Sequence, residues 1–203
     1  MTVNYEYDPD AASKADDVAS RIDTSGPYIG QFKLAHSITS SKGTEGLAFE
    51  FTSPGGGSAS FTVYTRKEDG TPTFGNNQLQ AMMGILGLRG LRSVEGKFEA
   101  WDNDTGKRVE VGGDTFPDLV GRDIGLVLQK EKYTKNNGQE GFRMNLFGIF
   151  HPVSRLTSSE IKERKTSPEK LEKMLRGLKD KDSRRVVEPE TPQPNVGGEP
   201  GAF

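Results

Sequence analysis

Apolar and polar residues alternate along the first half of the chain, and this pattern predicts β-strands. In residues 28–38 one parity holds Tyr28, Phe32, Leu34 and Ile38. The same alternation recurs in residues 47–52 and 58–66, with Ser/Gly-rich turns at 40–43 and 53–57. Three strands that follow one another through short turns indicate an antiparallel meander.

A helix and further strands are predicted after the meander. Asn76 or Asn77 is a suitable N-cap for a helix with an apolar stripe at Leu79, Met82, Met83 and Leu86. Weaker strand patterns follow at 97–101 and 107–111, then a compact turn at 116–121. Residues 123–133 and 141–150 form the clearest hairpin pattern, joined by an Asn-Asn-Gly turn.

These elements predict a mainly β fold, an antiparallel OB-like barrel with one inserted helix. A small β-sandwich is the alternative. Two short C-terminal helices follow, one starting at the capping-box pair Thr157 and Glu160, the other near Ser167-Pro168. The second carries an apolar stripe from Leu171 to Leu178. That stripe packs either on the barrel or across a homodimer, and the sequence leaves both open.

The chain therefore divides into four predicted segments. These are an acidic N-terminal arm (1–25), an OB-like nucleic-acid-binding core (26–153), a helical extension (154–181) and a disordered acidic tail (182–203). The last 18 residues hold three glutamates, four prolines and no Lys or Arg, a composition that does not form a core. Glu199, Pro200 and the terminal Phe203 predict a partner-binding peptide. A frayed terminus with a fortuitous phenylalanine is the alternative.

Charge is unevenly distributed along the chain. Residues 1–23 hold six acids and two bases, whereas the interior between both acidic ends holds 20 acids and 25 bases. A basic body with acidic arms is typical of a protein that binds a polyanion. No cysteine, signal peptide or membrane span is evident, so we expect a cytoplasmic protein without membrane contact.

Two stretches of the chain resemble known functional motifs but do not match them fully. The stretch Gly90–Lys97 has five residues between its glycine and the next, where a phosphate-binding loop has four, and no hydroxyl follows the lysine. Asp102, Asp104 and Gly106 resemble the start of a calcium loop but lack its closing glutamate. We therefore predict no enzyme activity, no metal and no cofactor.

The strand faces opposite the core combine aromatic residues with basic and polar ones. Aromatic rings among Arg, Asn and Thr suit base stacking, and neighbouring cations suit phosphates. The predicted nucleic-acid-binding residues are Tyr64, Arg66, Lys67, Arg92, Trp101, Lys132, Tyr133, Arg143 and Phe147. For Tyr64 and Phe147 the alternative is burial under helices, and for Trp101 it is a place in the core.

Four stretches resemble single-stranded DNA-binding proteins encoded by tailed bacteriophages. They are residues 26–30, residues 42–51, residues 74–83 with Phe-Gly-Asn-Asn and Met-Met, and residues 119–126. The resemblance spans roughly residues 26–160. It implies an OB-type core that coats single strands during replication or recombination, without a cofactor. The tail resembles the acidic, Phe-ended tails of replicative single-strand-binding proteins, although it lacks an aspartate run.

We therefore expect sequence-tolerant binding of single-stranded DNA, with replication or recombination proteins recruited by the tail. A protein–protein adaptor or virion structural protein built on the same barrel is the rival interpretation. An RNA-binding barrel is a third, because the sequence does not distinguish recognition of the 2′-hydroxyl. We also expect the acidic tail to compete with DNA for the basic groove.

Overall fold

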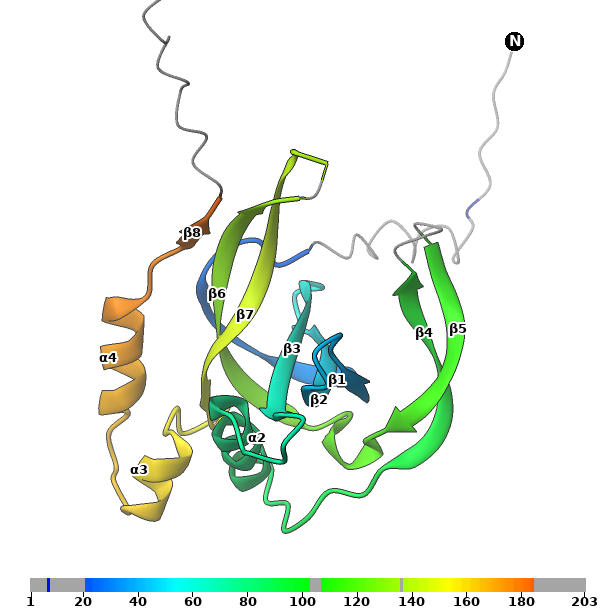
Figure 1. The fold of residues 1–203 in the computed structure, drawn as a ribbon. Coiled ribbons are helices and arrows are strands. Elements are labelled where there is room, and N and C mark those ends of the chain that lie inside the picture. The colour runs from blue at the N-terminus through cyan, green and yellow to red at the C-terminus, as the bar shows by residue number, and fades with distance from the viewer. Residues whose placement is uncertain (1–6, 8–20, 103–106, 136, 185–203) are drawn as a thin grey trace, which may run out of the picture.

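The computed structural model describes Tyr7 and residues 21–102, 107–135 and 137–184, with the side chains of residues 101 and 102 excepted. The elements in chain order are β1 (Gly26–Thr39), β2 (Glu45–Thr52), β3 (Ser58–Arg66), α2 (Phe74–Ile85), β4 (Val94–Asp102), β5 (Lys107–Thr115), the 3₁₀ turn η1 (Pro117–Leu119), β6 (Asp123–Thr134), β7 (Glu140–Phe150), α3 (Ser158–Lys162), α4 (Glu169–Gly177) and β8 (Lys181–Ser183). The predicted mainly β, antiparallel fold with few helices is confirmed (Figure 1).

The long strand β1 is shared by two parts of the sheet. Its first half, residues 26–31, pairs antiparallel with β6, and its second half, residues 31–39, pairs antiparallel with β2. β3 extends the meander beyond β2, and β7 extends the other side beyond β6. β3 and β7 lie next to each other, but no ladder joins them in the described part of the chain. The sheet is therefore not closed.

The core fills the inside of this curved sheet with aromatic rings. Phe32 lies 4.8 Å from Phe49 between ring centroids, and Phe49 stacks on Phe61 at 5.3 Å. The alternation predicted for β2 and β3 is confirmed, because Leu47, Phe49, Phe51, Phe61 and Val63 are all buried. Ile22, just before β1, is also buried and donates its backbone N–H to Ser58. Part of the predicted N-terminal arm thus packs on the core.

The parity predicted for β1 is wrong after Phe32. The pairing with β2 shifts between Phe32 and Leu34, so an extra residue enters the strand. Phe32 and Ala35 are both buried, while Leu34 and Ile38 are only half-buried on the opposite face. A β-bulge causes this, because one additional residue exchanges the two faces of a strand.

The parity predicted for the end of β7 is also wrong, because a second bulge interrupts this strand. The register shifts where Val127 pairs with Gly148 and Leu128 with Leu146, which leaves Phe147 as the extra residue. Ile149, predicted on the polar face, is therefore buried in the main core. Phe150, predicted in that core, packs on the other side of the sheet with Val127 and Leu171.

Helix α2 begins earlier than predicted. Its N-cap is Thr73 rather than Asn76 or Asn77, and the Thr73 hydroxyl donates to the Tyr64 carbonyl of β3 instead of capping the helix. Gly75 lies so close to β3 that a Cβ there would stand 2.0 Å from the Tyr64 oxygen. A glycine at this place lets the helix pack directly on the strand.

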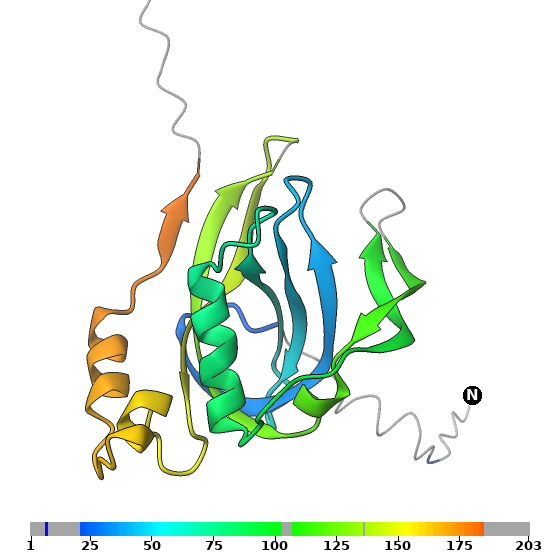
Figure 2. The same cartoon turned by 60° about the horizontal axis from the view of Figure 1, so that its bottom comes forward.

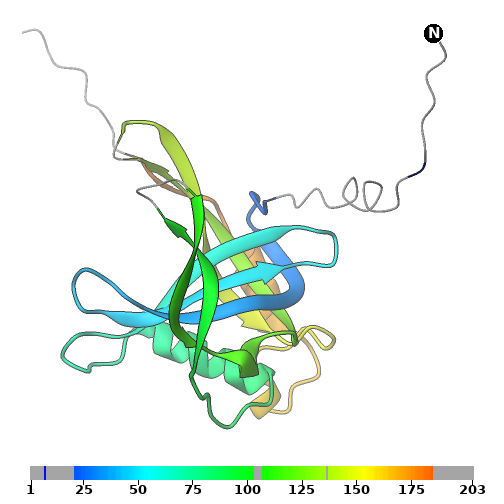
Figure 3. The ribbon, with the colours of Figure 1, turned by 90° about the vertical axis from the view of Figure 1, so that its right-hand side faces the viewer.

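Strands β4 and β5 form a hairpin arm that stands to one side of β1, β2 and β3 in Figure 1 and crosses in front of them in Figure 3. Both are longer than predicted, and none of their described side chains is buried. The arm touches the outer face of the meander through Phe98, which stacks on His36 at 4.2 Å between ring centroids. Arg108 adds an ion pair to Glu50 at 2.6 Å.

The C-terminal helices lie beside β7 and α2 (Figure 2). The predicted Thr157–Glu160 capping box at the start of α3 is confirmed. Leu171 is buried against Val127 and Phe150, with Met174, Leu175 and Leu178 packed around it. The stripe on α4 therefore packs within the chain. Asp182 and Ser183, expected in the tail, lie in β8, which pairs parallel with β6.

Candidate nucleic-acid interface

The C-terminal end of β3 carries one exposed aromatic ring followed by two exposed cations. The pairing with β2 shifts between Glu45 and Gly46, so Thr65 is an extra residue and Arg66 lies on the opposite face of the strand from Tyr64. Tyr64 is 42% exposed, and Arg66 and Lys67 are exposed at the strand end. Thr71 accepts the backbone N–H of Lys67, which closes a tight turn there. Neither cation has a salt bridge to a described acidic residue. The helix does not cover Tyr64, so this end of β3 has a ring and positive charge available to a ligand.

A second group lies on the β6–β7 hairpin, near Ser58 at the start of β3 and away from Tyr64 at the other end of that strand. Lys132 and Tyr133 are half-buried on β6, and Arg143 is exposed on β7. The Arg143 guanidinium carbon stands 5.6 Å from the centroid of the Tyr133 ring. The structure therefore brings these two predicted residues together as a cation–π pair.

Arg143 is also bound to a buried carboxylate. Glu131 is 2% exposed, and its Oε2 accepts from Arg143 Nε at 3.0 Å and from Asn145 Nδ2 at 2.7 Å. Its Oε1 accepts from Ser183 Oγ at 2.6 Å and from Lys181 Nζ at 3.1 Å. Four donors around one carboxylate fasten β8 to β6, so part of the Arg143 charge is neutralised within the protein.

These hydrogen bonds change the pKa of both Glu131 and Arg143. The hydrogen bond from Arg143 holds the pKa of Glu131 well below its usual value. Burial opposes that effect, while Ser183, Lys181 and Asn145 add to it. The same hydrogen bond raises the pKa of Arg143. Glu131 is therefore ionised throughout the neutral range.

The opposite face of the hairpin holds a cationic cluster that the sequence analysis missed. Phe142, expected in the core, is only half-buried. The Arg21 guanidinium carbon lies 4.2 Å from its ring centroid and Lys130 Nζ lies 4.8 Å from it. The signal was present in the sequence, because Lys130 and Lys132 continue the core parity of Leu128. That charged continuation indicates that the hairpin extends past the core.

The other predicted nucleic-acid-binding and partner-binding residues do not lie on β3 or on the β6–β7 hairpin. Arg92 is exposed between α2 and β4, and Trp101 is on β4 opposite Arg108, with its side chain outside the described residues. Phe147 is 39% exposed and faces α2 and α4 in a separate groove. Glu199, Pro200 and Phe203 lie outside the described residues.

Other kinds of site are not evident in the described chain. Residues 7, 21–102, 107–135 and 137–184 contain no cluster of three His, Cys, Asp or Glu side chains that could hold a metal ion. Within these same ranges, no helix is long and apolar enough to cross a membrane.

Comparisons with known proteins add no further assignment. No protein-family model matches the sequence, and a search of the curated proteins finds no significant match.

Proposed function

We propose that β1, β2, β3, α2, β6 and β7 form an OB-like core, with the β4–β5 arm as an insertion. Two features support this. The helix stands between the third and fourth strands of the core, and β1 pairs with both β2 and β6. OB-folds bind nucleic acids across their outer strands and the adjoining loops.

On this core we infer a sequence-tolerant site for single-stranded DNA. The observation that carries the inference is the end of β3, where exposed Tyr64 is followed by Arg66 and Lys67 without salt bridges to described acids. A base stacks on Tyr64 whatever its identity, and the two cations hold the adjoining phosphates. Lys132 and the Tyr133–Arg143 pair extend the path along the neighbouring hairpin, and Arg92 contributes a further phosphate contact.

The biological setting follows from the sequence resemblance. We propose that the protein coats and protects single strands during phage DNA replication or recombination. The acidic tail ending in Phe203 recruits replication or recombination proteins in this proposal, because its charge and terminal ring suit a basic, apolar pocket on a partner.

Variants at the end of β3 test the DNA site. Tyr64→Ala should weaken binding of an oligothymidine by about 5- to 150-fold, because stacking contributes ~1–3 kcal/mol per base. The thermal unfolding midpoint should fall by only a few degrees, since Tyr64 lies outside the buried core. Fluorescence anisotropy of the labelled oligonucleotide measures the first effect and calorimetry the second.

Removing both β3 cations tests the phosphate contacts. Arg66→Ala with Lys67→Ala should reduce the dependence of log K on log salt by about 1.4, or ~0.7 per phosphate lost. The matched control removes two exposed cations at the far end of α4, Arg176→Ala with Lys179→Ala, and should keep the wild-type slope. Equal slopes in all three proteins would contradict the site.

A further inference from the structure

A groove of about 1150 Å³ lies between α2, β7, α3 and α4, on a surface distinct from the proposed DNA path. Its apolar walls come from Phe74, Ala81, Phe147, Ile149 and Met174. Phe74 is 72% exposed and Phe147 is 39% exposed. Two neighbouring phenylalanines that remain this accessible are typical of a surface that binds a ligand.

The charge around the groove has one sign. Its lining includes Lys162, Lys170 and Lys173 and not one acidic residue. Lys170 Nζ is bonded to Ser159 Oγ at 2.7 Å and to Glu163 at 3.3 Å, whereas Lys162 and Lys173 make no salt bridge with a described residue. An apolar groove with lysines around it suits a ligand that combines a ring with negative charge.

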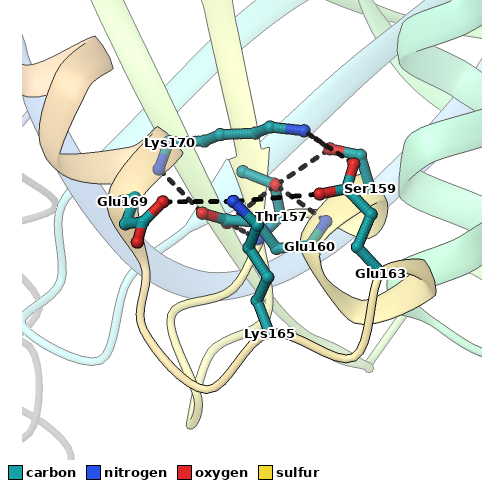
Figure 4. Close-up of polar contacts among 7 residues, drawn as sticks. All are labelled: Thr157, Ser159, Glu160, Glu163, Lys165, Glu169 and Lys170. Carbon is teal, nitrogen blue, oxygen red and sulfur yellow. Dashed lines mark hydrogen bonds and ion pairs between the residues drawn. The ribbon is translucent and has the colours of Figure 1, made fainter.

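A buried carboxylate, Glu160, binds the backbone of Lys170 at the start of α4 (Figure 4). Glu160 is fully buried and accepts the backbone N–H groups of Thr157 at 2.8 Å and of Lys170 at 2.7 Å. Burial raises the pKa of Glu160, but these hydrogen bonds outweigh it and the net pKa is lowered. An ionised Glu160 thus joins the start of α4 to α3, which holds both sides of the groove together.

The C-terminal segment, residues 185–203, has the complementary chemistry. After Arg185 it carries three glutamates and no Lys or Arg, and its last residue in the sequence is Phe203. Its start is near the groove, because Gly177 on the groove wall precedes Arg184 by seven residues, a span of at most ~25 Å. The 19 residues that follow can extend up to about 65 Å, so Phe203 can return to the groove of its own chain.

We propose that the last five residues of the chain dock in this groove. The Phe203 ring packs between Phe74 and Phe147, and Glu199 faces Lys162 and Lys173. The short tether gives the tail an effective concentration in the millimolar range, so a weak contact is sufficient. A protein partner of the tail then has to displace it from the groove. The inference does not depend on DNA binding.

Paramagnetic relaxation in the full-length protein tests this docking. The chain has no cysteine, so Ala202→Cys places a single nitroxide label next to Phe203. We expect the backbone amides of Gln78, Gly148 and Lys173 to lose signal intensity, while those of Glu99 and Val109 on the β4–β5 arm, on the side of the molecule away from α3 and α4 (Figure 1), keep theirs. Loss of signal on the arm instead, or no loss anywhere, would overturn the proposal.

Two controls make the result specific. Lys162→Glu with Lys173→Glu should abolish the signal loss in the groove, whereas Arg176→Glu with Lys179→Glu, an equal charge change outside the lining, should preserve it. A loss that survives the first pair of changes would overturn the charge argument.

The second control separates docking within one chain from docking between chains. An isotope-labelled chain without nitroxide, mixed with unlabelled nitroxide-bearing chain, should show no loss of signal intensity. A loss there would assign the groove to the tail of a second copy and overturn docking within one chain.

Discussion

At the scale of single residues, Glu131 shows how one buried charge organises the surface around it. Its two oxygens accept from Arg143, Asn145, Lys181 and Ser183. An ionised carboxylate in this position is favourable only while its donors remain in place, because an unpaired buried charge is costly. The path of the chain through β8, which leads into the tail, therefore depends on this residue.

Glu131→Gln should lower the free energy of unfolding at neutral pH by about 1–3 kcal/mol, because the donors around it lose an ionised acceptor. The lowered pKa also sets a pH dependence. Stability from Glu131 is fully present above its unfolded pKa, near 4.5, and is lost as pH falls below about 5. The wild-type midpoint should thus fall more steeply on acidification than that of the variant, as measured by circular dichroism.

Glu110→Gln is the matched control. Glu110 is bonded to Lys97 at 2.9 Å on the exposed arm, where a salt bridge contributes little. We expect its loss of stability to stay below about 0.5 kcal/mol. Equal losses in the two variants would contradict the role assigned to burial of Glu131.

The sequence predicted individual residues well where the strand was regular. Tyr64 and Thr62 lie on the exposed face of β3, as the alternation indicates. The alternation failed for residues that follow a bulge, namely Leu34, Ile38, Ile149 and, after the extra residue Thr65, Arg66. Alternation alone does not show where an extra residue enters, since that depends on the pairing with the neighbouring strand.

At the scale of elements, the β4–β5 arm differs from the rest of the sheet. It joins the meander through one pair of the ladder, His36 with Thr115, and through the His36–Phe98 stack. Gly96 and Gly113 pair directly with each other near its base. Few contacts and no buried described side chains predict a segment that opens locally at low free-energy cost.

Hydrogen exchange measures this difference. Backbone amides of β4 and β5 should exchange much faster than those of β1 and β2, which cover the aromatic core. Protection of the arm equal to that of β1 and β2 would show that the hairpin unfolds together with the body, contrary to this account.

The groove between the helices was not predicted, because it requires three elements that are distant in sequence. The apolar stripe of α4 indicates packing on a neighbour, and it does pack on Val127 and Phe150. It does not indicate that Phe74 from α2 and Phe147 from β7 remain exposed beside it. That information exists only once α2, β7 and α4 are placed together.

At the scale of the whole molecule, the proposed DNA path and the groove proposed for the acidic tail are formed by different sets of residues. The proposed DNA path uses Arg66, Lys67, Arg92 and Lys132, whereas Lys162 and Lys173 line the groove proposed for the tail. Tail docking there leaves the DNA path open, which differs from the direct competition that the sequence suggests. Release of the tail then governs partner binding rather than DNA binding.

The most direct measurement is the affinity of the full-length protein for a labelled oligothymidine of ~30 nucleotides, compared with a duplex of equal length, across a salt series. Arg66, Lys67, Arg92 and Lys132 make no salt bridge to described acids, so about four phosphates should be neutralised and the slope of log K against log salt should be near −3. The account predicts this slope together with much weaker binding of the duplex. No binding of the single strand at low salt, or equal binding of both, would contradict it.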